Sequence, residues 1–242
     1  MITRNINNYS LTILEDKSLL STYTSSFIEK LIIEKLTIKN RVQICLCGGS
    51  TPRIVYEILS KRNITWDKVD IFLGDERFVD PNSLESNTLM LKKSLLQNHA
   101  SKAYFYEFFK NGNLDEKVSK KLFLEAISLK CIGDPPCFDF TLLGLGDDGH
   151  TASLFPYKSN NYDDEYVIFS HGKGLKRISL TPKLISASSK VAFLVSGASK
   201  RLALERLISD NESSERTPAK MINSKTEISI FCDAEASKGL KI

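Results

Sequence analysis

The residues best suited to chemistry lie in the range Phe138–Pro156, where an apolar run ends in glycines, two aspartates and a histidine. The apolar part, 138–144, is typical of a buried strand, and in open α/β sheets ligands bind at the loops that leave the carboxyl ends of strands. Glycine tolerates positive φ, so Gly146 and Gly149 let the chain turn sharply close to a ligand. A histidine changes charge near neutral pH, which makes His150 the candidate for proton transfer. Taken alone, an Asp-Gly-His tripeptide also fits a strand-to-helix turn that the histidine merely caps.

A second glycine-rich segment, Gly48–Pro52, follows a strand-like run at 41–47. Gly49, Ser50 and Thr51 would suit a phosphate there, because backbone amides and the positive end of a helix dipole favour an anion. The segment has neither the Gly-Lys-Ser/Thr ending of a Walker loop nor the Gly-x-Gly-x-x-Gly dinucleotide fingerprint. The alternative is a simple helix N-cap by one of the two hydroxyl side chains.

Two further polar segments follow strand-like runs. Asp75 and Arg77 come after the run 69–74, and an arginine can hold a phosphate or carboxylate bidentately while an acid orients a sugar hydroxyl or water. An ion pair at the surface is the alternative for these two side chains. Lys200 is predicted in the first turn of a helix at 199–209, where a cation opposes the helix dipole unless an anionic ligand binds nearby.

The remaining candidate site residues have weaker support from the sequence. Arg177 stands near the start of a predicted strand, and Arg201 is the neighbouring alternative to Lys200. His99 and His171 lie in polar stretches without other catalytic residue types, so we expect both at the surface.

The elements that must position these residues alternate between strand-like and helix-like patterns. The predicted strands are 9–14, 41–47, 69–74, 138–144, 165–170, 176–181, 190–196 and 227–232, and the predicted helices are 16–36, 52–61, 86–98, 114–130 and 199–209. Strands separated by helices of this length indicate βαβ units with right-handed crossovers. We therefore predict an α/β fold, a mostly parallel Rossmann-like sheet flanked by helices, with 1–242 forming one domain and 209–218 a surface loop. Because parallel strands end at one edge of a sheet, the polar loops should meet there.

Composition narrows the classes of function. The chain has 42% hydrophobic and 26% charged residues and a net charge of +4, with its basic residues dispersed. This pattern is ordinary for a globular protein and gives little support for nucleic-acid binding. The five cysteines lack zinc-like spacing, and Cys45 and Cys47 share one face of a predicted strand, where we expect buried small hydrophobes. Because neither a signal peptide nor an apolar run of about 18 residues occurs, we expect a reduced, cytoplasmic protein without membrane contact.

In their order and spacing, these motifs resemble the 6-phosphogluconolactonase family, which implies a NagB/RpiA-like architecture. The matching segments are Gly48–Pro52, Gly74–Arg77 with Ser86–Asn87, Leu143–Pro156, Arg177–Thr181 and Gly197–Lys200, spread from about residue 41 to Ala236. The run 148–156 is the most specific. The wider superfamily includes glucosamine-6-phosphate deaminase, whose related segment has an Asn-Glu-Pro-type ending. Here the run 153–156 is Ser-Leu-Phe-Pro and lacks that acid.

The resemblance implies hydrolysis of 6-phospho-D-glucono-1,5-lactone to 6-phosphogluconate, in the oxidative pentose phosphate pathway, without a metal or organic cofactor. In this interpretation His150 is the general base toward water. Either Asp148 or Asp75 orients the imidazole or the water, and the sequence does not decide between the two aspartates. Arg77 or loop amides stabilise the oxyanion, unless Arg77 binds the phosphate instead.

For the distant phosphate, the resemblance points to the glycine-rich segment with Gly49, Ser50 and Thr51, together with Lys200 and, more weakly, Arg177. The expected partner is a phosphorylated sugar lactone, with no nucleic acid and no membrane, and the expected assembly is a monomer or weak homo-oligomer. Two other functions stay open, a glucosamine-6-phosphate deaminase/isomerase and a non-catalytic sugar-phosphate sensor.

Overall fold

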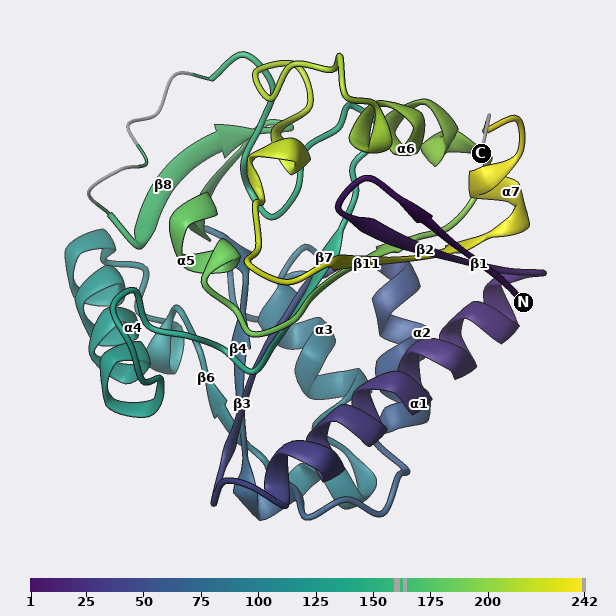
Figure 1. The fold of residues 1–242 in the computed structure, drawn as a ribbon. Helices are drawn as coiled ribbons and strands as arrows, with labels where there is room; N and C mark the ends of the chain where they lie inside the picture. Colours follow the sequence, from purple (N-terminus) through teal and green to yellow (C-terminus); the bar gives the residue numbers. More distant parts are fainter. Residues whose placement is uncertain (159–161, 163–164, 241–242) are drawn as a thin grey trace.

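The fold is built on two β-sheets, of which the larger is mostly parallel and has helices on both faces (Figure 1). The computed structural model describes residues 1–158, 162 and 165–240. The larger sheet has the order β1 (Ile2–Ile6), β2 (Tyr9–Leu14), β11 (Ile228–Asp233), β10 (Val191–Val195), β7 (Phe140–Gly144), β3 (Val42–Leu46), β4 (Val69–Leu73) and β6 (Tyr104–Tyr106). Neighbouring strands are parallel except for the β1–β2 hairpin. The predicted α/β class with a mostly parallel sheet is therefore confirmed.

The two edge strands were not predicted. Four of the five residues of β1 are exposed, and β6 has only three residues, the first of them exposed. β1 lacks the apolar pattern of a buried strand, and the Tyr-Phe-Tyr run of β6 is too short to predict one, so only pairing with a neighbour identifies each strand.

The smaller sheet corrects the prediction for three segments. It consists of β5 (Asp75–Arg77), β9 (Leu175–Leu180) and β8 (Val167–Gly172), and all of its pairs are antiparallel. Only two residues join β8 to β9, which permits a hairpin but not the crossover that a parallel pair needs. Asp75 and Arg77 were placed in a loop, whereas they form an edge strand one residue beyond β4.

Five helices lie close to their predicted ranges, and two short ones, α5 (Pro182–Ser186) and α7 (Ala234–Ser237), were not predicted. The five are α1 (Lys17–Leu36), α2 (Ser50–Leu59), α3 (Asn87–Ser94), α4 (Glu116–Lys130) and α6 (Arg201–Ile208), with short 3₁₀ turns η1 (Trp66–Lys68), η2 (Asn98–Lys102), η3 (Lys110–Gly112), η4 (Ala198–Lys200) and η5 (Pro218–Met221). The predicted helix 86–98 was too long. It ends at Ser94, and Asn98 has a left-handed φ of 49°, with which a right-handed helix cannot continue.

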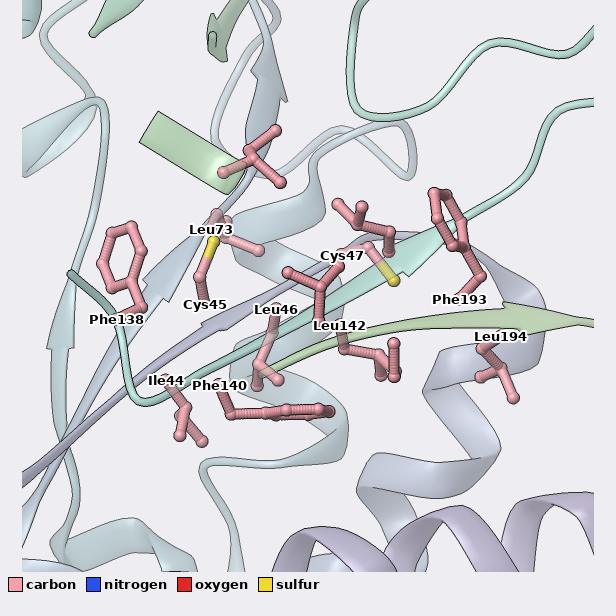
Figure 2. Packing of buried hydrophobic residues seen from close by; sticks show 14 of the residues in the cluster. Ile44, Cys45, Leu46, Cys47, Leu73, Phe138, Phe140, Leu142, Phe193 and Leu194 are labelled. Carbon is pink, nitrogen blue, oxygen red and sulfur yellow. The ribbon is translucent and has the colours of Figure 1, made fainter. Parts of the chain in front are cut away.

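The core lies around the central strands. All residues of β3 and β4 are buried, as expected where helices or loops cover both faces of a parallel sheet. Figure 2 shows Ile44, Phe140 and Leu142 packed together in this region. Cys45 and Cys47 are buried as predicted.

The order of the central strands creates a crevice for a ligand. From β3 the chain moves to β4 on one side, while β7 lies on the other side of β3, next to β10. This reversal is a topological switch point, at which the loops that follow neighbouring strands diverge. The loops after β3, β7 and β10 are the ones that carry the glycine-rich segment, His150 and Lys200.

Candidate active site

A cavity of about 230 Å³ lies at this edge of the large sheet. It brings together eight of the nine site residues expected from the sequence, namely Gly49, Ser50, Thr51, Asp75, Arg77, His150, Arg177 and Lys200. The ninth, Asp148, contacts His150 from outside the cavity wall. The expected convergence of distant loops is therefore present in the fold.

His150 and Asp148 form a close pair. The Nδ1 atom of His150 lies 2.5 Å from Oδ1 of Asp148, and the backbone N–H of His150 donates to the same oxygen at 3.1 Å. Burial acts to raise the pKa of Asp148, but the hydrogen bond and charge of His150 outweigh it and hold the pKa well below its usual range. An ionised carboxylate only accepts hydrogen bonds, so Nδ1 is the donor and Nε2 of a neutral imidazole keeps its lone pair. The imidazole contact is thus with Asp148 rather than Asp75.

The glycines of this loop make the pair possible. A Cβ atom at Gly146 would lie 2.0 Å from Nδ1 of His150 and 2.6 Å from Oδ1 of Asp148. Gly149 has a φ of 91°, which favours glycine, and its N–H donates to the carbonyl of Gly146 at 3.1 Å. The tight turn therefore folds the imidazole back over its own backbone.

An aromatic ring also packs against the imidazole. The Phe155 ring centroid lies 4.9 Å from that of His150, and the guanidinium carbon of Arg177 lies 5.3 Å from the same Phe155 centroid. Gly172 leaves room for this ring, since a Cβ there would come within 2.2 Å of it. Phe155 is thus packed near both the base candidate and a buried cation.

The start of α2 forms a second wall of the cavity. Gly49 is the N-cap residue with a φ of 122°, and within the described part of the chain no side chain caps this helix. The alternative in which Ser50 or Thr51 is the N-cap is therefore wrong, because both belong to the first turn of the helix. The first amides of a helix lack partners within it, and together with the helix dipole they favour an anion.

Lys200 occupies the wall formed by the loop after β10. It is the last residue of η4 and lies directly before α6, so its predicted place at the start of a helix is confirmed. Burial lowers the pKa of its ammonium group, and Lys173 adds to this while Asp147 and Asp148 oppose it. The alternative, Arg201, instead forms an ion pair with Glu235 at 2.6 Å.

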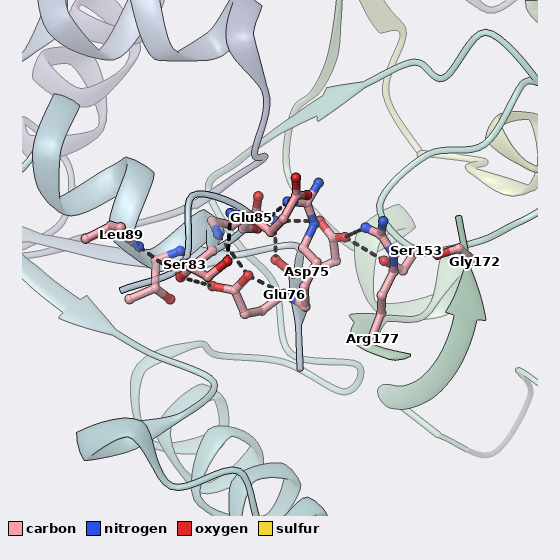
Figure 3. A network of polar contacts seen from close by, with 12 residues as sticks. Asp75, Glu76, Ser83, Glu85, Leu89, Ser153, Gly172 and Arg177 are labelled. Atoms are coloured by element: carbon pink, nitrogen blue, oxygen red, sulfur yellow. Dashed lines mark hydrogen bonds and ion pairs between the residues drawn. The ribbon is translucent and has the colours of Figure 1, made fainter. Parts of the chain in front are cut away.

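Asp75 is held by the cavity wall itself. Its Oδ2 atom accepts a hydrogen bond from the hydroxyl of Ser153 at 2.5 Å and lies 3.7 Å from Nη1 of Arg177 (Figure 3). The side-chain amide of Asn87 donates to the Asp75 carbonyl at 2.9 Å. These contacts join β5 to β9, to α3 and to the histidine loop, so Asp75 shapes the site through its neighbours.

The two arginines lie side by side across the small sheet. Arg77 pairs with Arg177 in the register of β5 and β9. Burial lowers the pKa of Arg177, the charge of Arg77 lowers it further, and Asp75 opposes both. Arg77 donates to the backbone carbonyl of Glu85 and lies 3.7 Å from that residue's carboxylate. Two guanidinium groups thus line the cavity together, with the Asp75 and Glu85 carboxylates close to them.

Several residues of the site were not assigned from the sequence. Asn87 was noted only in a matching segment, but it lines the cavity and fits against Gly48, where a Cβ would fall 1.9 Å from its Oδ1. Glu76 was treated only as a neighbour of Asp75, yet its buried carboxylate accepts backbone N–H groups of Arg77, Asn87 and Thr88. Its role as a buried cap of α3 depends on tertiary packing and gives no local sequence signal.

Other features of the chain lie outside the cavity. His99 and His171 are exposed, as predicted. Among the described residues, no helix is long and apolar enough to span a bilayer, and no three His, Cys, Asp or Glu side chains are grouped as metal ligands would be.

Comparisons with known proteins agree with this architecture. A family model described as glucosamine-6-phosphate isomerases/6-phosphogluconolactonase matches residues 15–230. The 6-phosphogluconolactonase of Nostoc sp. is 33% identical over 208 residues, covering 84% of this chain and 87% of the relative. The 6-phosphogluconolactonase of Synechocystis sp. is 33% identical over 202 residues, covering 82% and 84%.

Solved structures show the same similarity. The crystal structure of a 6-phosphogluconolactonase from Shewanella baltica superposes with a TM-score of 0.82 at 26% identity, covering 93% of this chain and 97% of that one. The 6-phosphogluconolactonase structure from Thermotoga maritima gives a TM-score of 0.79 at 26% identity, covering 93% and 99%.

Proposed function

Because the chain belongs to the glucosamine-6-phosphate isomerase/6-phosphogluconolactonase family, we propose that it hydrolyses 6-phospho-D-glucono-1,5-lactone to 6-phosphogluconate. The observation that carries this proposal is the composition of the cavity. At one wall the imidazole of His150 is held by Asp148, and at others lie Lys200 and the uncapped start of α2. A base near an ester and cationic groups for a phosphate are what this reaction requires.

The first step is addition of water to the lactone carbonyl. Nε2 of His150 takes a proton from a water molecule while the water oxygen forms a bond to the carbonyl carbon, whose π electrons move onto its oxygen. Asp148 keeps the imidazole in the tautomer that can accept this proton and stabilises the imidazolium that forms. The product of this step is a tetrahedral oxyanion.

The second step opens the ring. The oxyanion re-forms the carbonyl, the bond from this carbon to the ring oxygen breaks, and the imidazolium of His150 returns its proton to that oxygen. The ring oxygen becomes the free hydroxyl of the product and the former water becomes part of the carboxylic acid. The histidine ends the cycle neutral.

Arg77 has two possible roles in this scheme. It lines the cavity next to Arg177, so it is suited either to the oxyanion or to the phosphate. Phosphate binding by Lys200, Ser50 and Thr51 supplies orientation, because the phosphate is remote from the reacting carbonyl. Removal of a phosphate-binding side chain should therefore mainly raise KM, whereas removal of a group that acts at the carbonyl should mainly lower kcat.

The proposal is tested with freshly generated lactone, by comparing its decay with and without the protein. We expect rapid hydrolysis by the wild type, and a kcat about 10²–10⁴-fold lower for His150→Asn, the range typical of a lost general base. His171→Asn is the matched control, because this histidine is exposed and outside the cavity.

Glucosamine 6-phosphate is supplied in parallel. Release of ammonia from it would favour the deaminase, and the buried Phe155 where that enzyme has its acid predicts none. Binding of 6-phosphogluconate without faster lactone decay would instead indicate a sugar-phosphate sensor and would reject the catalytic proposal.

A further inference from the structure

Asp233 is a buried carboxylate that the proposed mechanism does not use. It ends β11, its exposed fraction is 4%, and it is absent from the cavity wall as formed by the described residues. Its Oδ2 atom accepts the hydroxyl hydrogen of Ser196 at 2.5 Å. The backbone N–H of Gly197 lies 3.0 Å from Oδ1 and 3.1 Å from Oδ2, and Oδ1 also accepts the N–H of Ala236 at 2.8 Å.

The pairing of β10 with β11 creates this contact. Val195 pairs with Cys232 in the parallel register, so the next residue on each strand, Ser196 and Asp233, also lie together. β10 ends at this point and its chain turns toward the cavity. The carboxylate of one strand therefore holds the first two residues of the loop that leaves its neighbour.

That loop leads directly to Lys200. Gly197 has a φ of 94° and a ψ of 157°, a conformation open to glycine and strained for other residues. Its N–H is bound by Asp233, and its carbonyl accepts the backbone N–H of Lys200 at 3.0 Å. A short series of contacts thus runs from the carboxylate through the Gly197 peptide to the backbone of Lys200.

The side chain that anchors the start of α6 is that of Arg201, whose guanidinium donates to the Glu235 carbonyl at 2.7 Å and pairs with the Glu235 carboxylate at 2.6 Å. Within the described residues no side chain caps this helix, and its N-cap position is Lys200 itself. The backbone of Lys200 therefore lies between two contacts, the one from Gly197 to Asp233 before it and the one from Arg201 to Glu235 after it. The histidine loop is held separately, through Asp148 and through the Gly146 turn.

We propose that Asp233 is a positioning residue for anion binding, which fixes the Ser196–Lys200 turn so that the Lys200 ammonium group reaches the phosphate of the substrate. This inference rests on the proposed function and assigns a role to a residue outside the cavity. Without the carboxylate, the turn loses the acceptor for two donors and the flexible lysine loses a fixed backbone. Phosphate affinity then falls while the His150–Asp148 pair stays intact.

The test is a comparison of KM and kcat in Asp233→Ala. We expect KM for the phosphorylated lactone to rise about tenfold or more, since bonds to a buried charge are lost, with kcat within about threefold of wild type. The dissociation constant of 6-phosphogluconate, measured by calorimetry, should rise by a similar factor. Asp233→Asn should recover most of the affinity, because its amide oxygen can still accept the Gly197 and Ala236 N–H groups and its NH₂ can donate to Ser196.

Two further variants keep the test decisive if Asp233→Ala does not fold. Gly197→Ala leaves the carboxylate in place but strains the turn, and there is open space around its Cβ, so it should raise KM in the same way. Ser237→Ala is the control, because its hydroxyl contacts the backbone carbonyls of Asp233, at 3.2 Å, and Ala234 and the thiol of Cys232, and not the Asp233 carboxylate. It should leave both constants unchanged.

The outcomes separate this inference from the proposed function. If the wild type does not accelerate lactone decay, the proposed function fails, and binding of 6-phosphogluconate to the variants still tests the role of Asp233. If Asp233→Ala and Gly197→Ala bind 6-phosphogluconate as tightly as the wild type, or if they lower kcat with KM unchanged, the positioning role is wrong.

Discussion

Arg77 and Arg177 lie directly opposite each other in the antiparallel register of β5 and β9. Like charges in facing positions destabilise a strand pair, by about 0.2–1 kcal/mol. The nearby Asp75 and Glu85 carboxylates offset part of this repulsion. An anion bound in the cavity would offset more of it, so the arrangement favours the ligand-bound state.

Replacement of Arg77 tests this interpretation. We expect Arg77→Gln to reduce kcat/KM about 10²–10³-fold. If the guanidinium stabilises the oxyanion, the loss appears as a lower kcat, and if it binds the phosphate, the loss appears as a higher KM. The thermal stabilisation that inorganic phosphate gives to the wild type should also shrink in the variant. Unchanged kinetics together with unchanged stabilisation by phosphate would remove Arg77 from the site.

Lys200→Ala should raise KM for the phosphorylated lactone about tenfold or more and leave kcat nearly unchanged, because in the proposed mechanism the ammonium group orients the substrate and does not touch the reacting bond. Lys121→Ala is the matched control, since it removes the same charge from an exposed position on α4. Initial rates at several substrate concentrations give both constants. A KM equal to that of the control would exclude Lys200 from the phosphate site.

Asp148→Asn should lower kcat by about 10²–10⁴-fold with little change in fold. An asparagine can donate its NH₂ to Nδ1 of His150, which moves the imidazole proton to Nε2 and removes the lone pair that would take a proton from water. Asp75→Asn serves as the comparison, because Asp75 contacts Ser153 and Arg177 rather than the imidazole. An equal loss in both variants would argue against the tautomer explanation.

The same aspartate predicts how stability depends on pH. Burial raises the pKa of Asp148, but the contacts with His150 lower it more, so the folded-state pKa lies below the unfolded value of about 4. The carboxylate therefore stabilises the fold fully above about pH 4, and this contribution is lost as pH falls through the folded-state pKa. Urea unfolding should show wild type more stable than Asp148→Asn at pH 7, with the difference shrinking toward pH 3. If the difference in unfolding free energy between the two proteins were the same at pH 7 and pH 3, the lowered pKa of Asp148 would not contribute to stability.

Gly146→Ala should impair catalysis without large damage to the core. The new Cβ would meet the imidazole and the Asp148 carboxylate, so the pair must separate and kcat should fall by at least about tenfold. Gly74→Ala is the control, because its Cβ would make only ordinary contacts, at 3.8 Å with Cys45 and 3.9 Å with the Leu46 carbonyl. The comparison needs kcat and a far-ultraviolet circular dichroism spectrum for each variant. Near-normal kcat in Gly146→Ala would show that the imidazole does not need its present position.

The convergence of the polar loops could be predicted because it follows from chain direction alone. Once 41–47, 138–144 and 190–196 are parallel strands, their following loops must share an edge, and the structure confirms this. The small sheet could not be predicted in the same way. The three residues of β5 are polar, and their strand conformation exists only because β9 pairs with them.

The sequence also could not show which of the two aspartates contacts His150. Asp75 and Asp148 both follow buried strands, and their side-chain partners depend on how distant elements pack. Ser153 reaches Asp75 only because the histidine loop crosses the start of the small sheet. Asp233 is a similar case, since its partners Ser196 and Gly197 come from a neighbouring strand more than 30 residues earlier in the chain.

The phenyl ring of Phe155 is in contact range of two groups of the site, the imidazole of His150 and the guanidinium of Arg177. In the proposed mechanism His150 becomes a cation when it holds the proton taken from water, so the ring then contacts two positive groups at once. Because Gly172 leaves the volume that the ring fills, a larger side chain at this position of the β8–β9 hairpin would displace the ring from its contact with the imidazole. The chemistry of the cavity therefore depends on a backbone position that never touches the substrate.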